Sequence, residues 1–138
     1  MIVADTNLVA YLLLNSGQTE EAEKVHERDP EWRLPPFWRD EYVNVLWRFH
    51  RKGDLTRGEA IRAWREGIEL LGESEVAVDG ESVLENAMRY AITAYDAQFV
   101  SLAESLGVPL VTFDRKLVRA CRGVAVSYSG FLRKRPRQ

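Results

Sequence analysis

The sequence is poor in cysteine, with Cys121 as the single thiol in 138 residues. One thiol cannot form an internal disulfide, and this usage is typical of proteins from a reducing compartment. No apolar run approaches the roughly 20 residues that span a membrane. The apolar N-terminus lacks a preceding basic region and is interrupted by Asp5 and Asn7, so we expect no signal peptide. We therefore expect a soluble cytoplasmic protein without a membrane segment.

Several kinds of functional motif are also missing. The two histidines, His26 and His50, have no histidine or cysteine partner at the spacing of a zinc site. Cys121 has no paired histidine in a motif typical of a catalytic thiol. The chain has no glycine-rich loop of the kind that cradles a nucleotide phosphate. The net charge of −2 argues against a generally basic nucleic-acid binder, although local basic patches are compatible with it.

The chain has the size and composition of one globular domain, with 46% hydrophobic and 29% charged residues. Short apolar segments predict strands at residues 1–4, 32–34, 74–78, 109–112 and 124–126. Helical periodicity predicts helices at residues 6–14, 19–28, 37–52, 57–71, 81–93, 96–106 and 116–122. This alternation is typical of a parallel sheet that helices cover on both faces.

The predicted helices have apolar faces that should form the core. For the helix at 37–52 this face comprises Tyr42, Val45, Leu46 and Phe49. For the helix at 57–71 it comprises Ile61, Trp64, Ile68 and Leu71, and we expect these two helices to pair as an antiparallel hairpin. For the helix at 81–93 it comprises Leu84, Ala87, Met88, Ala91 and Ile92. For the helix at 96–106 it comprises Phe99, Leu102, Ala103 and Leu106.

Helix ends and tryptophans add further expectations. Thr56 with Glu59 matches a capping box, and Thr19 is expected to cap the helix at 19–28. Trp38, Trp47 and Trp64 should pack in the core or at an interface. A minor alternative is that the helical hairpin shows an aromatic surface to a partner chain.

Four carboxylates stand at strand ends or helix starts. Asp5 and Asp114 each follow a predicted strand, whereas Asp96 lies on the inward row of its helix. Glu41 borders an apolar helix face, in a polar row with Asn44 and Arg48. Taken singly, the three aspartates could be helix caps and Glu41 a solvated residue of a first helical turn.

Convergence of these four carboxylates, here named the acidic quartet, would have chemical consequences. Mutual repulsion would raise their pKa values, and a divalent cation would relieve it. Ligands that are all oxygen suit Mg²⁺ or Mn²⁺ better than zinc. Such a cation can lower the pKa of bound water and neutralise charge on a phosphodiester, so the pattern indicates metal-assisted hydrolysis of a phosphate ester.

Four segments of the chain carry a resemblance to a known family. They are IVADTN (2–7), EYVNVL (41–46), YDAQFVSLA (95–103) and LVTFD (110–114). In this order and over nearly the whole chain, the sequence resembles a PIN-domain ribonuclease, specifically the VapC toxins of toxin–antitoxin pairs. The resemblance implies a Rossmann-like three-layer α/β/α sandwich, with a central parallel sheet and a protruding helical hairpin. We expect the PIN domain to cover residues 1–132, followed by a basic, frayed tail at 133–138.

The same resemblance implies an activity and its site. The activity would be selective RNA cleavage with Mg²⁺ or Mn²⁺. Asp5 and Asp96 would be the principal metal ligands. Glu41 would help to hold metal and position the attacking water, and Asp114 would bind a second metal or a metal-bound water.

Further residues and partners follow from the resemblance. Thr6, Asn7 and Thr112 match polar positions near the metal, where hydrogen bonds tune the ligands, although turn and cap roles remain alternatives. The implied partners are an RNA substrate, a VapB-like antitoxin that blocks the cleft, and a second copy of the chain in a homodimer.

Basic side chains could rim the cleft and contact RNA phosphates. Candidates are Arg39, Arg48, Arg51, Lys52, Arg115, Lys116, Arg119 and the tail at 133–137. Two alternatives remain at this point. One is a non-catalytic PIN-fold module that binds RNA or protein. The other is a phosphoacceptor receiver domain, which is disfavoured because Asp5 has no acidic neighbour in sequence and no lysine follows Val126 as far as Gly130.

Overall fold

A parallel sheet forms the middle of the molecule. The computed structural model describes residues 1–134, and within them the sheet has four strands in the order β2-β1-β3-β4. These strands are β1 (Ile2–Ala4), β2 (Trp32–Arg33), β3 (Leu110–Thr112) and β4 (Ala125–Ser127). Every neighbouring pair is parallel, which confirms the predicted parallel sheet. The strand order reverses at the β1–β3 pair, and open α/β sheets bind ligands beyond the carboxyl ends of strands at such a point.

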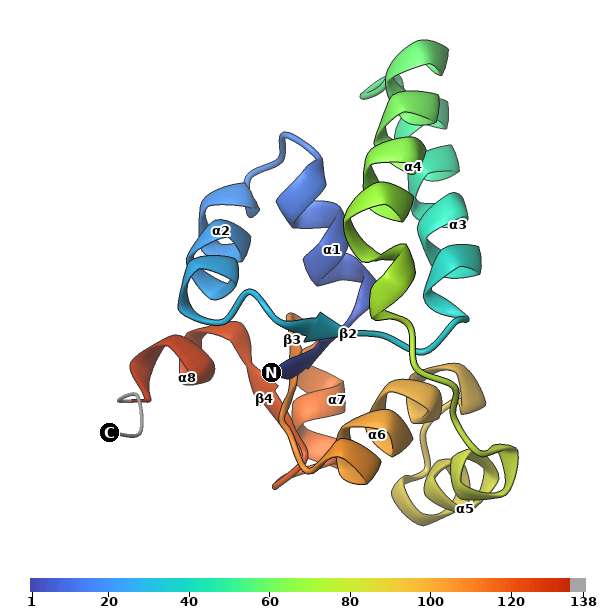
Figure 1. Ribbon diagram of the computed structural model, residues 1–138, viewed down its shortest axis with the longest axis vertical. Coiled ribbons are helices and arrows are strands. Elements are labelled where there is room, and N and C mark those ends of the chain that lie inside the picture. The colour runs from blue at the N-terminus through green and yellow to red at the C-terminus, as the bar shows by residue number, and fades with distance from the viewer. Residues whose placement is uncertain (135–138) are drawn as a thin grey trace.

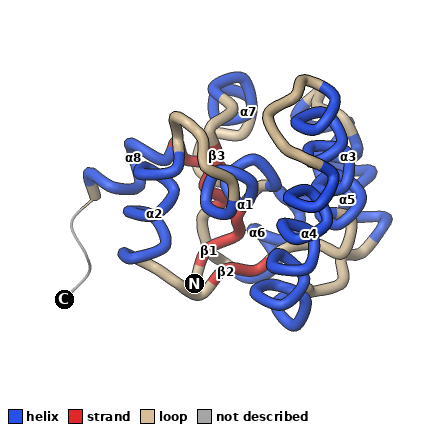
Figure 2. Tube along the Cα trace, turned by 90° about the horizontal axis from the view of Figure 1, so that it is seen from above, coloured by secondary structure: helices blue, strands red, loops and turns tan. Residues whose placement is uncertain are grey.

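Helices cover both faces of this sheet. Those in the described residues are α1 (Thr6–Leu13), α2 (Thr19–Arg28), α3 (Trp38–Arg51), α4 (Arg57–Leu71), α5 (Gly80–Tyr90), α6 (Ala94–Leu106), α7 (Arg115–Ala120) and α8 (Tyr128–Arg133). Helices α1 and α2 lie on one side of the strands, and α5, α6 and α7 lie on the other (Figure 1). Helices α3 and α4 form a hairpin that stands to one side of the strands (Figures 1 and 2). The predicted three-layer sandwich and protruding hairpin are thus confirmed.

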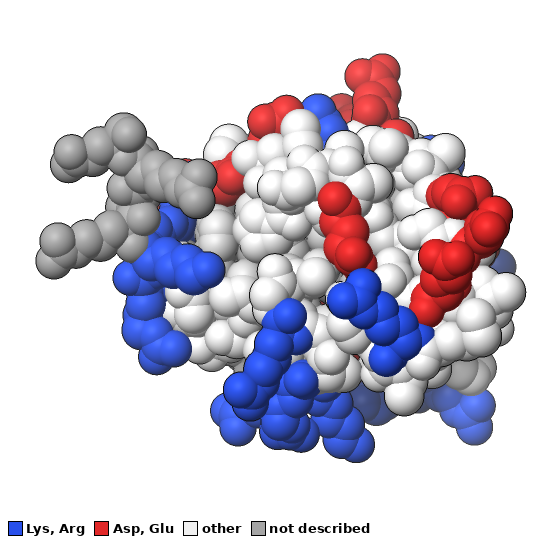
Figure 3. Space-filling view, turned by 90° about the horizontal axis from the view of Figure 1, so that it is seen from below, with Lys and Arg blue, Asp and Glu red and all other residues white. Residues whose placement is uncertain are grey.

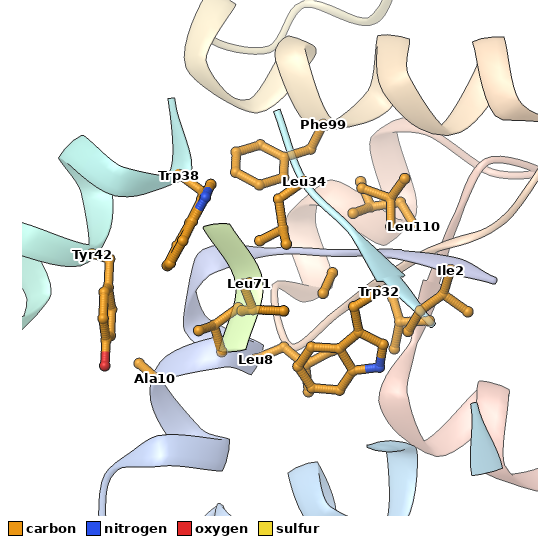
Figure 4. Packing of buried hydrophobic residues seen from close by; sticks show 14 of the residues in the cluster. Ile2, Leu8, Ala10, Trp32, Leu34, Trp38, Tyr42, Leu71, Phe99 and Leu110 are labelled. Carbon is orange, nitrogen blue, oxygen red and sulfur yellow. The ribbon is translucent and has the colours of Figure 1, made fainter. Parts of the chain in front are cut away.

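The core packs against both faces of the central strands. Phe99 of α6 approaches from one side, and Leu8 of α1 lies on the other (Figure 4). The predicted inward face of α6 is confirmed, because Phe99, Leu102 and Ala103 are buried and Leu106 is partly buried against the core. All three residues of β1 are buried as well. This packing fixes the ends of β1 and β3, and therefore the residues that follow them. None of the helices at residues 1–134 is long and apolar enough to cross a membrane.

The predicted strand at 74–78 is wrong. The chain forms a 3₁₀ turn, η1 (Gly72–Ser74), and then a single parallel bridge between Leu34 and Glu75. The amide of Leu34 donates to the carbonyl of Ser74, and the amide of Val76 donates to the carbonyl of Leu34. The segment then leaves the sheet edge. Glu75 is extended, but the alternation of apolar residues could not show that the pairing with Leu34 is limited to this one residue.

The predicted buried face of α5 is partly wrong, although Ala87 and Ile92 are half-buried as members of that face. Leu84 and Met88 are 58% and 67% exposed, whereas Val83 and Asn86 are buried. Asn86 Nδ2 donates a hydrogen bond of 2.8 Å to Ser101 Oγ of α6, so the contact between α5 and α6 is partly polar. The helix also ends earlier than predicted, because Ala91 adopts a left-handed conformation with φ of 54°. A pattern based on hydrophobicity selects the wrong side of such a helix.

Other differences concern helix ends and the C-terminal region. Thr19 is the first residue of α2 rather than its cap, and its hydroxyl donates to the carbonyl of Leu14 at 2.6 Å. The last strand, β4, lies one residue later than predicted. Arg133 ends a helix, α8, that the sequence did not predict. Residues 135–138 of the predicted tail lie outside the described residues.

The hairpin of α3 and α4 closes around a glycine. Tyr42 of α3 is fully buried and donates a hydrogen bond of 2.8 Å to the carbonyl of Ala63 in α4. A Cβ atom on Gly67 would lie 2.5 Å from Cε2 of this ring. The predicted α4 face is therefore partly wrong, because Gly67 and Ala63 are buried while Ile61 is 49% exposed. Thr56 and Glu59 do form the predicted capping box.

We expect Gly67→Ala to destabilise the protein by about 1 to 2 kcal/mol, because the added methyl group overpacks a hydrogen-bonded ring that cannot move freely. Thermal unfolding should show a melting temperature lower by several degrees. Gly58→Ala is the matched control, since it lies in the same helix with open space around the added Cβ. Equal melting temperatures for the two variants would contradict the close contact between α3 and α4.

Candidate active site

One pocket lies at the carboxyl ends of β1 and β3. Its volume is about 150 Å³. The residues that line it are Asp5, Thr6, Asn7, Glu41, Asn44, Val45, Arg48, Asp96, Phe99, Asp114 and Leu117. This set includes the whole acidic quartet, so carboxylates from four separate parts of the chain face one cavity. Of the three polar residues expected nearby, Thr6 and Asn7 line the pocket, and Thr112 lies behind it with its hydroxyl on Asp5.

Asp5 is both a helix cap and a pocket residue. Its Oδ1 accepts a hydrogen bond of 2.9 Å from the amide of Leu8 and so caps α1. Its Oδ2 accepts a hydrogen bond from the hydroxyl of Thr112, the last residue of β3. The two central strands are therefore linked through this carboxylate, which holds the side chain in one orientation.

Asp114, which follows the neighbouring strand β3, is likewise both a helix cap and a pocket residue. Its Oδ1 caps α7 by accepting from the amides of Lys116, at 2.9 Å, and Leu117, at 3.2 Å. The amide of Asp114 donates to the hydroxyl of Thr112 at 2.9 Å. Thr112 thus contacts both Asp5 and Asp114. Asp114 is itself exposed.

Glu41 and Asp96 come from helices rather than strand ends. Glu41 lies in the first turn of α3, and its Oε1 accepts a hydrogen bond of 2.9 Å from the buried hydroxyl of Thr6. Asp96 lies in the first turn of α6. The alternative that Asp96 caps this helix is wrong, because Thr93 is the cap and accepts from the amide of Asp96 at 3.1 Å. No described residue donates a hydrogen bond of standard geometry to the Asp96 carboxylate.

The pocket raises the pKa values of Asp5, Glu41 and Asp96. Burial raises the pKa of Asp5 to about 6, against the hydrogen bonds from Thr112 and Leu8, and the negative charges of Asp114 and Asp96 add to the rise. Burial likewise raises the pKa of Glu41, with a smaller contribution from the charges of Asp96 and Asp5. Burial and the charge of Asp114 raise the pKa of Asp96. The sequence predicted repulsion as the cause, whereas loss of solvent contributes more.

The donor set suits a hard divalent cation. All the acids offer oxygen, and none of them forms an ion pair with a described Lys or Arg. Within residues 1–134, however, no three His, Cys, Asp or Glu side chains stand close enough together to hold a metal ion directly. The arrangement therefore fits an ion that keeps part of its water shell and contacts some carboxylates through water, as Mg²⁺ commonly does.

Basic residues are distributed unevenly around this pocket. Arg48 is the one basic residue among the described pocket-lining residues, while Arg39 forms an ion pair with Glu75 and Arg51 stacks on Trp47. Arg115, Lys116 and Arg119 lie exposed on α7, beyond its cap Asp114. Figure 3 shows Lys and Arg side chains gathered toward one border of the lower face, with most Asp and Glu side chains elsewhere. Local basic regions thus exist despite the net charge.

The sequence did not predict the apolar wall of the pocket. Val45, Phe99 and Leu117 form that wall beside the carboxylates. Val45 and Phe99 were assigned to the core, and they do pack there, so their second role left no separate signal. Asn44 was recognised only as a member of the polar row with Glu41 and Arg48. Its helical spacing to Glu41 was the signal that could have placed it in the site.

Known proteins resemble this chain in sequence and in fold. The family model for the PIN domain matches residues 2–123. Ribonuclease VapC3 of Pyrobaculum aerophilum is 30% identical over 122 residues, which cover 84% of this chain and 91% of that protein. Ribonuclease VapC9 of Mycobacterium tuberculosis is 32% identical over 125 residues, which cover 85% of this chain and 88% of that protein.

The fold has solved counterparts too. The crystal structure of PAE2754 from Pyrobaculum aerophilum superimposes with a TM-score of 0.74 at 23% identity, covering 95% of this chain and 92% of that one. At this identity the likeness concerns the fold alone. The match of the family model, the two relatives and the shared architecture agree with one another, and the chain belongs to the PIN domain family.

Proposed function

We propose that this protein is a metal-dependent endoribonuclease that hydrolyses RNA phosphodiester bonds with Mg²⁺ or Mn²⁺, as the toxin of a VapBC-type toxin–antitoxin pair. The observation that carries the proposal is the meeting of the acidic quartet in one pocket, with no basic partner among the described residues and with raised pKa values for Asp5, Glu41 and Asp96. The names of the relatives, which are ribonucleases, support the choice of RNA as substrate.

Each member of the quartet has a distinct part in this proposal. Asp5 and Asp96 are the principal metal ligands, directly or through water. Asp114 holds a second ion or a water of the first. When bound, the divalent cation supplies charge neutralisation at the phosphate and lowers the pKa of water.

Glu41 orients the attacking water through its free carboxylate oxygen, because its other oxygen is held by Thr6. Thr112 keeps the Asp5 carboxylate fixed, and Asn7 offers a further polar group at the mouth. Hydrogen bonds of this kind to ligand residues typically change metal affinity or activity by about 10- to 100-fold.

The proposal extends to partners and to the extent of the domain. It includes a VapB-like antitoxin that blocks the pocket, a homodimer, and action in the cytoplasm. It also takes residues 1–132 as the PIN domain and residues 133–138 as a basic tail. The exposed apolar side chains Val43, Trp47 and Ile61 of the α3–α4 hairpin are consistent with a protein partner.

The test is cleavage of total RNA from a plausible host by purified protein. We expect discrete cuts with Mg²⁺ or Mn²⁺ and none in EDTA, because the quartet needs a cation to accept a phosphodiester. Asp5→Asn, purified identically, should be inactive while keeping the cap of α1 through its side-chain oxygen. Cutting that persists in EDTA, or equally in the variant, would refute the metal-dependent activity. Full RNA binding without metal and without cleavage would favour a non-catalytic RNA-binding module.

A further inference from the structure

Arg48 is an isolated cation in an acidic pocket. It lies on α3 seven residues after Glu41 and four after Asn44, so these three side chains share one side of the helix. Arg48 is exposed. It forms no ion pair with any carboxylate in residues 1–134. Arg48 lines the same cavity as the quartet yet pairs with none of it, so its guanidinium is available to another anion.

Helix geometry explains why Arg48 stays apart from the quartet. Seven residues of α-helix separate the Cα atoms of Glu41 and Arg48 by about 10 Å along the axis, so the two residues lie two turns apart rather than on adjacent turns. An anion held by Arg48 therefore lies beside the carboxylates rather than among them. Asn44 lies between the two charged residues and can donate or accept a hydrogen bond.

An RNA strand needs a cation at this place. Each phosphate carries a negative charge, and the strand must approach four carboxylates, of which a divalent cation offsets only part. A guanidinium binds phosphate through two parallel hydrogen bonds, which fixes position as well as charge. The apolar wall of Val45, Phe99 and Leu117 offers phosphate no such contact.

Building on the proposed function, we propose that Arg48 binds the substrate phosphate next to the scissile one and thereby sets the register of the RNA strand in the pocket. Arg48 is thus a substrate-binding residue, and Asn44 lies along the path between the two phosphates. The exposed basic residues of α7, which are Arg115, Lys116 and Arg119, contribute only general attraction.

The test measures RNA binding without cleavage. Asp96→Asn protein in Mg²⁺ is titrated with a labelled pool of random-sequence single-stranded RNA over a range of salt concentrations. We expect Arg48→Gln to weaken binding about three- to tenfold and to reduce the slope of log affinity against log salt by about 0.7, the value for one lost phosphate contact on a single strand. Arg48→Lys should keep the slope and lose part of the affinity, because lysine keeps the charge without the paired hydrogen bonds.

Arg65→Gln is the matched control, because Arg65 is exposed on α4 and does not line the pocket. It should change neither affinity nor slope. Identical slopes for Arg48→Gln and Arg65→Gln would overturn the assignment, even if the wild-type protein cleaves RNA. A lower melting temperature for Arg48→Gln with an unchanged slope would overturn it in favour of a structural role. A reduced slope in a protein that never cleaves RNA would support the phosphate contact while refuting the nuclease.

Discussion

Asp96→Asn is expected to lose RNA cleavage by at least about a thousandfold while its metal-free fold becomes more stable. Activity falls because charge stabilisation by a bound cation is worth several kcal/mol, and each 1.36 kcal/mol is tenfold in rate. Stability rises because Asn removes a charge whose ionisation is opposed by burial and by Asp114, as the raised pKa of Asp96 indicates. Thr93 remains the cap of α6, so the substitution leaves that helix end intact.

The two readouts of this variant move in opposite directions, which separates a functional loss from unfolding. Cleavage is measured on total RNA under single-turnover conditions, and stability by thermal unfolding in EDTA at neutral pH. Asp40→Asn is the control, because Asp40 is an exposed acid in the first turn of α3 that does not line the pocket. If the Asp96→Asn protein unfolds at a lower temperature than wild type in EDTA, the Asp96 charge does not destabilise the metal-free fold, which would contradict this prediction.

A divalent cation is expected to stabilise the protein strongly, and more so at neutral than at acidic pH. A ligand at a hundred times its dissociation constant adds about 2.7 kcal/mol to the free energy of unfolding, roughly 8 to 12 °C in melting temperature for a domain of this size. Asp5 must be ionised to bind the cation, and its pKa in the metal-free protein is about 6. The stabilisation should therefore shrink as the pH falls through 6.

Without metal, pH should act on Asp5 in the opposite direction. The folded state binds this proton more tightly than the unfolded state, whose pKa is near the ordinary value of 3.8. The resulting penalty is complete above pH 6, decreases as the pH falls, and vanishes below 3.8. Between pH 7.5 and pH 5 the metal-free protein should gain about 1 to 1.5 kcal/mol from Asp5 alone. The raised pKa values of Glu41 and Asp96 act in the same direction.

These effects are measured by thermal unfolding at both pH values, with Mn²⁺ or with EDTA, for wild type and Asp5→Asn. The comparison between the two proteins cancels the titration of groups distant from Asp5. Asp5→Asn should lose most of the metal effect and part of the gain at low pH. If Mn²⁺ shifts both proteins equally at pH 7.5, the ion binds elsewhere and the assignment of Asp5 as a ligand fails.

Local signals predicted most of the fold. The buried strands β1 and β3 were found because each is a short apolar run between turn residues. The apolar faces of α3 and α6 were found because helical spacing is regular over several turns. The wrong predictions share a cause, because the structure of each segment depends on a partner that is distant in the sequence. The extended segment at 74–78 lacks a second strand residue opposite it, and α5 packs through the polar pair of Asn86 and Ser101.

The site was predictable to a different degree for each kind of residue. Acids after strands stand out, because a parallel sheet gathers the carboxyl ends of its strands at one edge. The hydrogen bonds from Thr6 to Glu41 and from Thr112 to Asp5 join residues 35 and 107 positions apart, and nothing local indicates such pairs. The dominance of burial over repulsion in the pKa values likewise depends on the walls of the pocket, which the sequence did not predict.

Asp5 and Asp114 each line the pocket and cap a helix, and this pair of roles affects how a nuclease of this kind would lose its activity during evolution. Both carboxylates cap a helix, so most replacements at these positions cost stability as well as function. Glu41 and Asp96 cap no helix and carry a desolvation penalty, so we expect their loss to cost the fold less than loss of a cap, although replacing Glu41 also removes the hydrogen bond from Thr6. Inactive descendants should therefore change first at positions 41 and 96 and retain Asp, Asn or Ser at 5 and 114. A relative with that combination would be a former enzyme in which residues 5 and 114 are retained because they cap α1 and α7.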